Sequence, residues 1–216
     1  MEICISALLA GKIAPLGERQ ASSGIDKKPV SGPVRLLRDG LECDEQGDRK
    51  VHGGPEKAVH HYPHDHYADW RKDVGDNPRL DASGAFGENI STTGLTEHNV
   101  AVGDRFRIGT ALVEVSQGRQ PCWKLNARFD VPDMAVRVQK TGRTGWYIVF
   151  LKKGSLLRTM RCCSSSGYHQ NGRCNGSGIC FTSICSTMIS LLRWLRSHTL
   201  QTAGSVMLSA VSKIAR

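Results

Sequence analysis

One of the eight cysteines lies in a segment whose residue types favour reactivity. Residues 115–126 read VSQGRQPCWKLN, and Cys122 follows Pro121 there. Proline restricts the residue before it and stiffens the loop. Arg119 and Lys124 flank the sulfur, and nearby cations favour the thiolate, which is the nucleophile and the metal ligand. A lone cysteine is also commonly a buried structural residue, so this segment alone leaves both interpretations of Cys122 open.

A second segment, residues 40–62, combines glycines with basic side chains. It reads GLECDEQGDRKVHGGPEKAVHHY. Exposed backbone N–H groups beside basic side chains make an anion site, although Gly-Gly-Pro is also ordinary turn chemistry. The candidate anion-binding residues of this segment are Arg49, His52, Gly53, Gly54 and Lys57.

A third segment, residues 84–95, reads GAFGENISTTGL and places Glu88 and Asn89 at the start of an expected strand. Glu88 is a candidate for holding a ligand or a basic neighbour. Without further context, a turn with a structural salt bridge is the favoured interpretation of this segment.

The net charge of +9 is confined to the C-terminal third of the chain. Nine of the 29 basic residues and none of the 20 acidic ones follow residue 147, so residues 1–147 carry 20 of each sign. A neutral first part argues against nucleic acid as a partner. We see no signal peptide and no apolar run of transmembrane length. We therefore expect a cytoplasmic protein with reduced thiols and no membrane partner.

Residues 148–216 have a composition unlike that of ordinary proteins. They contain five cysteines but no Asp, Glu or Pro, whereas charges of both signs are the norm. The cysteine gaps do not complete a zinc-binding set. Regrouping the codons by one base permits segments of balanced charge, beginning Glu-Glu-Gly-Phe-Val. We therefore hypothesise that residues 148–216 are out of frame, irregular and without designed structure, and that one nucleotide was lost just after Tyr147.

Strand patterns dominate the first part of the chain. Residues 3–13 and the alternating runs at 105–109 and 111–116 predict strands. Residues 64–75 and 131–139 predict short helices. We expect a mainly β fold, a β-barrel-like core with a few short helices, and a domain that ends at residue 147.

Taken together, these segments resemble the MOSC family, the domain shared by molybdenum-cofactor sulfurases and their standalone relatives. The resemblance runs from about residue 5 to Tyr147 and includes VGDRFRIG and TGRTGWY (residues 141–147). Cys43 stands where the family has glycine, and a positive φ at that position would strain it. The resemblance implies a core over about residues 30–147 and a strand after Tyr147. It leaves open whether that closing strand is present or is replaced by the apolar residues 148–151.

The resemblance further implies a molybdopterin-type molybdenum cofactor with Cys122 as the metal ligand. It implies reduction of N-hydroxylated small molecules, such as hydroxylamino purine bases, with electrons from a separate reductase. It also leaves a homodimer open. The residues that we expect at the cofactor are Arg49, His52, Gly53, Gly54, Lys57, Glu88, Asn89, Arg119 and Lys124.

Two other functions remain open from the sequence. Because MOSC domains occur fused to pyridoxal-phosphate-dependent sulfurases, Cys122 could instead carry a persulfide. No lysine context suggests a pyridoxal phosphate site in this chain itself. The third alternative is an inactive product of the frame slip.

Overall fold

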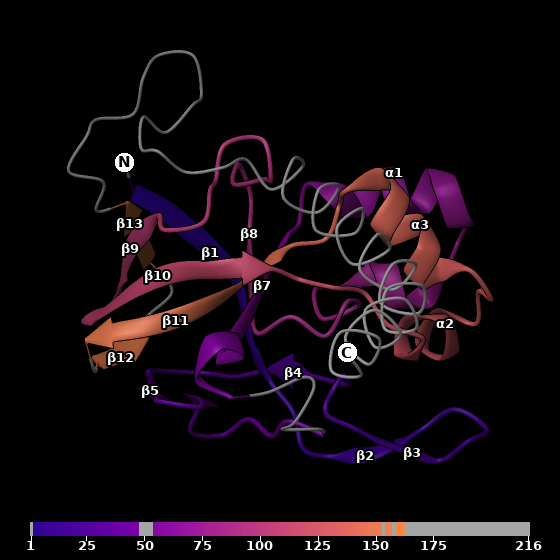
Figure 1. Ribbon diagram of the computed structural model, residues 1–216, viewed down its shortest axis with the longest axis horizontal. Helices are drawn as coiled ribbons and strands as arrows, with labels where there is room; N and C mark the ends of the chain where they lie inside the picture. The colour runs from indigo at the N-terminus through magenta and orange to yellow at the C-terminus, as the bar shows by residue number, and fades with distance from the viewer. Residues whose placement is uncertain (1, 48–53, 153, 157–158, 163–216) are drawn as a thin grey trace, which may run out of the picture. The chain divides into compact units, whose positions relative to one another are not determined.

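The computed structural model describes residues 2–47, 54–152, 154–156 and 159–162 (Figure 1). Contacts divide the chain into a unit Met1–Phe181 and a unit Thr182–Arg216. All the described residues belong to the first unit, and the following paragraphs concern that unit.

The fold is mainly β, as the sequence predicts. Most strands belong to one eight-stranded sheet in the order β13-β9-β10-β11-β7-β8-β1-β4. These strands are β1 (Glu2–Ala10), β4 (Lys28–Pro29), β7 (Val59–Pro63), β8 (Ile90–Thr92), β9 (Arg105–Ile108), β10 (Ala111–Gly118), β11 (Trp146–Lys152) and β13 (Thr159–Cys162). Two small sheets accompany it. They comprise β2 (Ala14–Leu16) with β3 (Ala21–Ser23), and β5 (Val34–Leu37) with β6 (Gly40–Leu41) and β12 (Gly154–Leu156).

The eight-stranded sheet curls and closes on itself. Strand β13 pairs antiparallel with β9 and also with β1. The neighbours β10 and β11 lie side by side along most of their length (Figure 1). Only β7 and β8 among the described strand pairs run parallel. The closed ring has an inside, and its strands supply that inside with alternate side chains.

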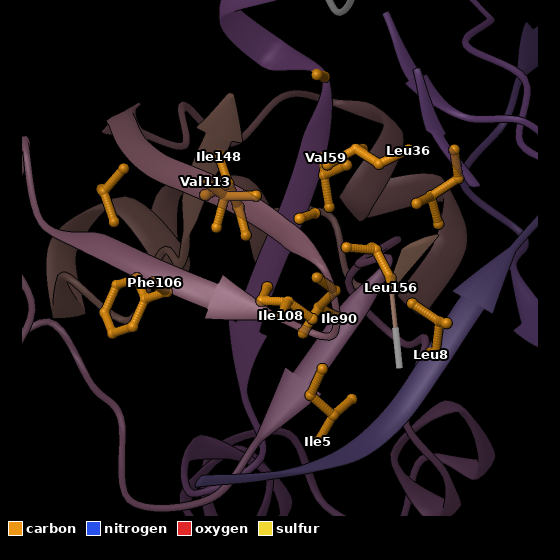
Figure 2. Close-up of a cluster of buried hydrophobic side chains, with 14 of the residues drawn as sticks. Ile5, Leu8, Leu36, Val59, Ile90, Phe106, Ile108, Val113, Ile148 and Leu156 are labelled. Atoms are coloured by element: carbon orange, nitrogen blue, oxygen red, sulfur yellow. The ribbon is translucent and has the colours of Figure 1, made fainter. Parts of the chain in front are cut away.

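The inside of the curled sheet is the main hydrophobic core. On β10, Ala111, Val113 and Val115 are buried while the residues between them are partly exposed. This alternation is the period of two that the sequence shows. Figure 2 shows side chains from several strands gathered in this core, with Ile90 and Leu156 among them.

Three α-helices, grouped together in Figure 1, and a second cluster of buried side chains form the other part of the unit. The helices are α1 (His66–Val74), α2 (Lys124–Phe129) and α3 (Met134–Thr141). The 3-10 turn η2 (Pro78–Asp81) contacts α1, whereas the 3-10 turn η1 (Pro55–Lys57) contacts β10 and β11. Trp70, Phe86 and Phe129 pack in the second cluster, with 5.0 Å between the ring centroids of the two phenylalanines. No helix in the described part of the chain is long and apolar enough to span a membrane.

The sequence predictions can be compared with these elements. The strands predicted at residues 3–13, 105–109 and 111–116 are present, and so is the helix predicted at 64–75. The helix predicted at 131–139 is present, but it begins three residues later, at Met134. Helix α2 was not predicted, because six residues give too short an apolar pattern.

The chain does not leave the sheet at residue 147. The expected domain boundary falls inside β11, which runs on to Lys152 and pairs with both β10 and β7. Strands β12 and β13 follow, so the described part does contain closing strands. The prediction of an irregular tail is therefore wrong for these strands. Residues 153, 157–158 and 163–216 of the predicted tail lie outside the described residues. Cys43 does not have a positive φ, so the strain considered for it does not arise.

Candidate functional site

Cys122 lies in the short connection between β10 and α2. Its backbone carbonyl accepts a hydrogen bond from Leu125 N–H at 3.0 Å, which starts the helix. The thiol is half-buried, and Cys122 forms no disulfide among the described residues. It forms part of the wall of a hollow, which we call the thiol pocket.

The thiol pocket is built from segments that are far apart in the sequence. The loop after β3, the Asp44–Gly47 segment, the start of β7, the Phe86–Asn89 turn and the β10–α2 connection all contribute to it. The residues that line it are Ser23, Gly24, Ile25, Lys27, Asp44, Glu45, Gln46, Gly47, Lys57, Ala58, His60, Phe86, Gly87, Asn89, Arg119, Gln120, Cys122, Lys124 and Tyr147.

The structure brings together half of the residues predicted from the sequence. Lys57, Asn89, Arg119 and Lys124 line the thiol pocket with Cys122. Three of these four residues, Lys57, Arg119 and Lys124, carry positive charge, so cations line the pocket that contains Cys122.

The two cations beside the cysteine are held differently. Lys124 Nζ donates to the Ser22 carbonyl at 2.8 Å, which ties α2 to β3. Arg119 is buried, with 6% of its surface exposed, and its Nη2 donates to the Phe86 carbonyl at 3.3 Å. Arg119 Nη1 is buried and has no hydrogen-bond partner among the described residues. A buried donor without a partner is costly, so Nη1 is suited to hold a ligand.

Glu88 does not line the thiol pocket. Its carboxylate is fully buried and accepts hydrogen bonds from Gly84 N–H at 2.6 Å and Phe86 N–H at 3.1 Å. Tyr67 donates its hydroxyl to the same carboxylate at 2.5 Å. A buried carboxylate requires such donors. Glu88 therefore holds the Gly84–Gly87 turn, which is close to the structural interpretation of this segment.

Asn89 both lines the pocket and joins three segments. Its Oδ1 accepts from His60 N–H at 3.1 Å, and its Nδ2 donates to the Leu9 carbonyl at 3.1 Å. The same Nδ2 donates to Asp44 Oδ2 at 2.9 Å. Its amide group is therefore occupied within the protein.

The remaining predicted residues belong to the glycine-rich turn. Arg49, His52 and Gly53 lie outside the described residues. Gly54 precedes η1 with a φ of +93°, which only glycine adopts easily, and its N–H donates to Gln46 Oε1 at 3.3 Å. Gly54 does not line the pocket, whereas Lys57 at the end of η1 does.

A buried ion pair in the pocket was not predicted. Lys27 Nζ lies 2.5 Å from Asp44 Oδ1, and both side chains are more than nine-tenths buried. Burial lowers the pKa of Lys27, and the Asp44 charge opposes this shift. The two residues are 17 positions apart in a polar part of the sequence, so no local pattern marks them.

His60 and Tyr147 also line the pocket without having been singled out. They are register partners on β7 and β11, and their ring centroids lie 5.5 Å apart. Burial, followed by the charge of Arg119, lowers the pKa of His60 well below its usual value. Burial raises the pKa of Tyr147, and Arg119 opposes that shift. The two adjacent histidines in the segment VHHYP could have indicated this part of the pocket, because polar side chains in an otherwise apolar strand commonly have hydrogen-bonding or ligand-binding roles.

The pocket wall is also shaped by close backbone packing. A Cβ added at Gly24 would lie 2.2 Å from the Glu45 carbonyl oxygen. At Gly87, where φ is +75°, it would lie 2.6 Å from Ile25 Cγ1. These segments approach so closely only because both residues lack a side chain.

The chemistry of the wall fits a sulfur-rich, anionic metal cofactor. A thiolate is a soft ligand that suits such metals. Lys57 and Lys124 supply positive charge for a phosphate, and the buried Nη1 of Arg119 offers a further donor. His60 Nε2 is likewise buried without a hydrogen-bond partner among the described residues.

Comparison with known proteins identifies the class that this fold and pocket define. The MOSC domain matches residues 48–159, which is more than half of the chain. The chain therefore belongs to the MOSC domain family.

Three relatives illustrate the match. Protein YiiM of Escherichia coli (strain K12) is 47% identical over 146 residues, covering 68% of this chain and 65% of that protein. A protein of Gibberella moniliformis named "Reductase" is 42% identical over 140 residues, covering 64% of this chain and 25% of that protein. The crystal structure of YiiM from Geobacillus stearothermophilus superposes with a TM-score of 0.61 at 33% identity, covering 76% of each chain. The chain thus spans less than two thirds of the length of the two sequence relatives.

Proposed function

We propose that the chain binds a molybdenum cofactor of the molybdopterin type in the thiol pocket, with the Cys122 thiolate as the metal ligand. The observation that carries this proposal is that the thiol lines a pocket together with three positively charged side chains. Cys122 is half-buried in a hollow that it shares with Arg119, Lys57 and Lys124. A soft ligand among cations is the combination that an anionic, sulfur-bearing metal group requires.

The cations are proposed to hold the cofactor's phosphate and dithiolene side. Lys57 and Lys124 are partly exposed at the pocket, and Arg119 is a buried residue of its lining. Arg49 and His52 of the glycine-rich turn stay candidates for the same phosphate. Glu88 contributes by holding the turn that carries Phe86, not by contact with the cofactor.

The proposed reaction is the reduction of an N-hydroxylated compound such as a hydroxylamino purine. One R–NH–OH, two electrons and two protons give R–NH2 and one water, and the N–O bond breaks. The bound molybdenum would supply the two-electron redox chemistry, and a separate reductase protein would supply the electrons. The name of the longer Gibberella relative supports a reductive role.

The chain's own residues are proposed to orient the substrate and exclude water. His60 is uncharged at neutral pH because burial and Arg119 lower its pKa. A neutral imidazole can accept or donate a hydrogen bond without adding charge to the pocket. Arg119 lines the same pocket, and its guanidinium can only donate hydrogen bonds. Together they fit a group that carries both donor and acceptor atoms, as an N-hydroxylated amine does.

An activity assay tests the reductive role. Chain loaded with cofactor is mixed with a hydroxylamino purine and reduced methyl viologen, and the aminopurine is quantified. We expect turnover from the unaltered chain and from Cys43→Ser, and none from Cys122→Ser. Equal turnover by Cys122→Ser would contradict the role of this thiol.

A sulfur-carrier role is the alternative that the same thiol allows. The cationic hollow would stabilise a persulfide anion as it would a thiolate. Mass spectrometry separates the two roles, because a persulfide adds one sulfur to the Cys122 peptide and requires no metal.

A further inference from the structure

Glu97 is a buried carboxylate outside the thiol pocket that the proposed function does not use. It lies between β8 and β9, with 3% of its surface exposed. Its Oε2 lies 2.6 Å from His66 Nε2, at the start of α1. Its Oε1 accepts a hydrogen bond from Gly145 N–H at 2.7 Å. Glu97 therefore joins the helical part of the unit to the residue that precedes β11.

Gly145 is in contact with two residues that line the thiol pocket, Arg119 and His60. Its carbonyl accepts a hydrogen bond from Arg119 N–H at 3.1 Å. A Cβ added at Gly145 would lie 3.2 Å from His60 Nε2 and 2.3 Å from the His61 carbonyl oxygen. With a φ of +68° and no room for a side chain, Gly145 is a position that only glycine fits.

We infer that Glu97 is a positioning residue, which sets the place of Arg119 and His60 in the thiol pocket by fixing the peptide of Gly145. The hydrogen bonds run in one line, from the Glu97 carboxylate to Gly145 N–H, and from the Gly145 carbonyl to Arg119 N–H. His66 holds the far oxygen of Glu97 and so fixes the direction of the carboxylate. Glu97 anchors this line because both of its carboxylate oxygens are held, one by His66 Nε2 and one by Gly145 N–H.

This role of Glu97 rests on the proposed function of the thiol pocket, but the experiment that tests it requires no cofactor. The guanidinium of Arg119 has one nitrogen on the Phe86 carbonyl and one buried nitrogen without a partner in the described part of the chain. The side chain of Arg119 contacts Phe86 and Tyr147, and its backbone is fixed by the hydrogen bond to the Gly145 carbonyl. Loss of Glu97 would let the Gly145 peptide rotate and would move the positive charge away from the sulfur.

The sign of the electrostatic effect separates positioning from a simple charge effect. Removal of the negative charge of Glu97 on its own makes the thiol pocket more positive. Displacement of Arg119 makes the pocket less positive at Cys122. The two effects oppose each other, so the direction of the change identifies its cause.

Alkylation of Cys122 measures the local potential without any cofactor. The purified full-length chain is treated with iodoacetate or with iodoacetamide, and the two rates are compared. The tryptic peptide that ends at Lys124 carries Cys122 as its single cysteine, so mass spectrometry follows this thiol alone. Thiolate fraction and access affect both reagents alike, and the ratio of the rates reports attraction for the anionic reagent.

We expect Arg119→Gln to lower the iodoacetate-to-iodoacetamide ratio about threefold. Glu97→Ala is expected to lower it about twofold, against the sign of its own charge change. Glu97→Gln keeps an acceptor for Gly145 N–H and should leave the ratio unchanged or slightly higher. In the Arg119→Gln background, Glu97→Ala should cause no further decrease, since it acts through Arg119.

Controls keep this inference testable. Glu114→Ala removes a carboxylate that pairs with Arg105 on the sheet at 2.8 Å, and it should not change the ratio. If Glu97→Ala does not fold, Glu97→Asp keeps the charge but is too short to reach both partners, and it should lower the ratio. A folded Glu97→Ala or Glu97→Asp with an unchanged or raised ratio would overturn the inference. The inference would also be overturned if Glu97→Ala lowered the ratio in the Arg119→Gln background as much as it does in the unaltered chain. These outcomes do not depend on molybdenum binding, so a failure of the proposed function is distinguishable.

Discussion

At the scale of single residues, the strand β7 carries two buried histidines that remain uncharged. Burial lowers the pKa of His61 from 6.5 to about 3, and the charge of His66 adds to this shift. His61 stacks on Trp146 with 4.2 Å between ring centroids, and its Nε2 lies 2.9 Å from Thr92 Oγ1. His60 on the opposite face of the strand shifts in the same direction. The wall of the thiol pocket thus owes its positive charge to lysine and arginine.

The lowered pKa of His61 predicts a loss of stability in acid. Between pH 6.5 and about pH 3 the unfolded chain binds a proton at His61 that the folded chain does not. The free energy of unfolding is therefore expected to fall in this window, by about 1.4 kcal/mol per pH unit for each such histidine. Denaturant titrations from pH 7 to pH 4 should show a shallower fall for His61→Gln and an unchanged fall for the exposed His98→Gln. Parallel profiles for all three proteins would contradict this account.

The sequence singles out Cys122 as the candidate ligand, but it does not reveal most of the residues that surround it in the pocket. Cys122, Arg119 and Lys124 are predictable because they lie within six positions of one another. Lys27, Asp44 and Glu97 are not, because their partners come from distant segments and nothing in their local sequence marks them as buried. Glu88 stands out in the local sequence, but its carboxylate holds the Gly84–Gly87 turn and does not line the pocket.

At the scale of elements, Asp44 holds three segments together beside the pocket. Its carboxylate accepts from Lys27 Nζ at 2.5 Å and from Gly11 N–H at 2.8 Å, at the end of β1. It also accepts from Asn89 Nδ2, just before β8, at 2.9 Å. The loops that contain Lys27 and Asp44 are thereby tied to the sheet.

Removal of this carboxylate should be strongly destabilising. Asp44→Ala leaves the buried Lys27 ammonium unpaired, and loss of one partner of a buried pair costs about 3–5 kcal/mol. Guanidinium denaturation monitored by circular dichroism measures this loss. The neighbouring Glu45 pairs with Lys12 at the surface, so Glu45→Ala should cost far less. Similar losses for the two variants would show that the Lys27–Asp44 pair has no special role.

The elements themselves are predictable to different degrees. Alternation along 105–116 reveals β9 and β10 because one face of each is buried and the other is not. Helix α2 escapes detection because it has six residues and no capping side chain. Its position still matters, since it begins two residues after Cys122.

At the scale of the whole molecule, the sheet closes through residues after Tyr147. Leu156 on β12 is fully buried in the main core, and Figure 2 shows it among the side chains of that core. The predicted boundary rested on composition and charge, which report how a segment differs from its neighbours but not where pairing ends. The hypothesis of a frame slip stays a prediction, and the coding DNA after Tyr147 tests it.

Truncation of the side chain of Leu156 tests whether the residues after Tyr147 belong to the folded unit. Leu156→Ala is expected to cost about 2–5 kcal/mol, because it leaves a cavity in the core. Leu151 on β11 is 44% exposed, and Leu151→Ala should change the stability by no more than about 0.5 kcal/mol. Thermal and denaturant unfolding of both variants measure the difference. No loss for Leu156→Ala would mean that the core ends before β12.

The central claim is that Cys122 binds molybdenum, and the metal content of purified protein tests it most directly. The full chain is produced in cells that make the molybdenum cofactor, and molybdenum and protein are quantified together. We expect about one molybdenum per chain in the unaltered protein and in Cys4→Ala, and almost none in Cys122→Ala. Cys122→Ala that keeps its molybdenum, or unaltered protein that carries none, would contradict the account.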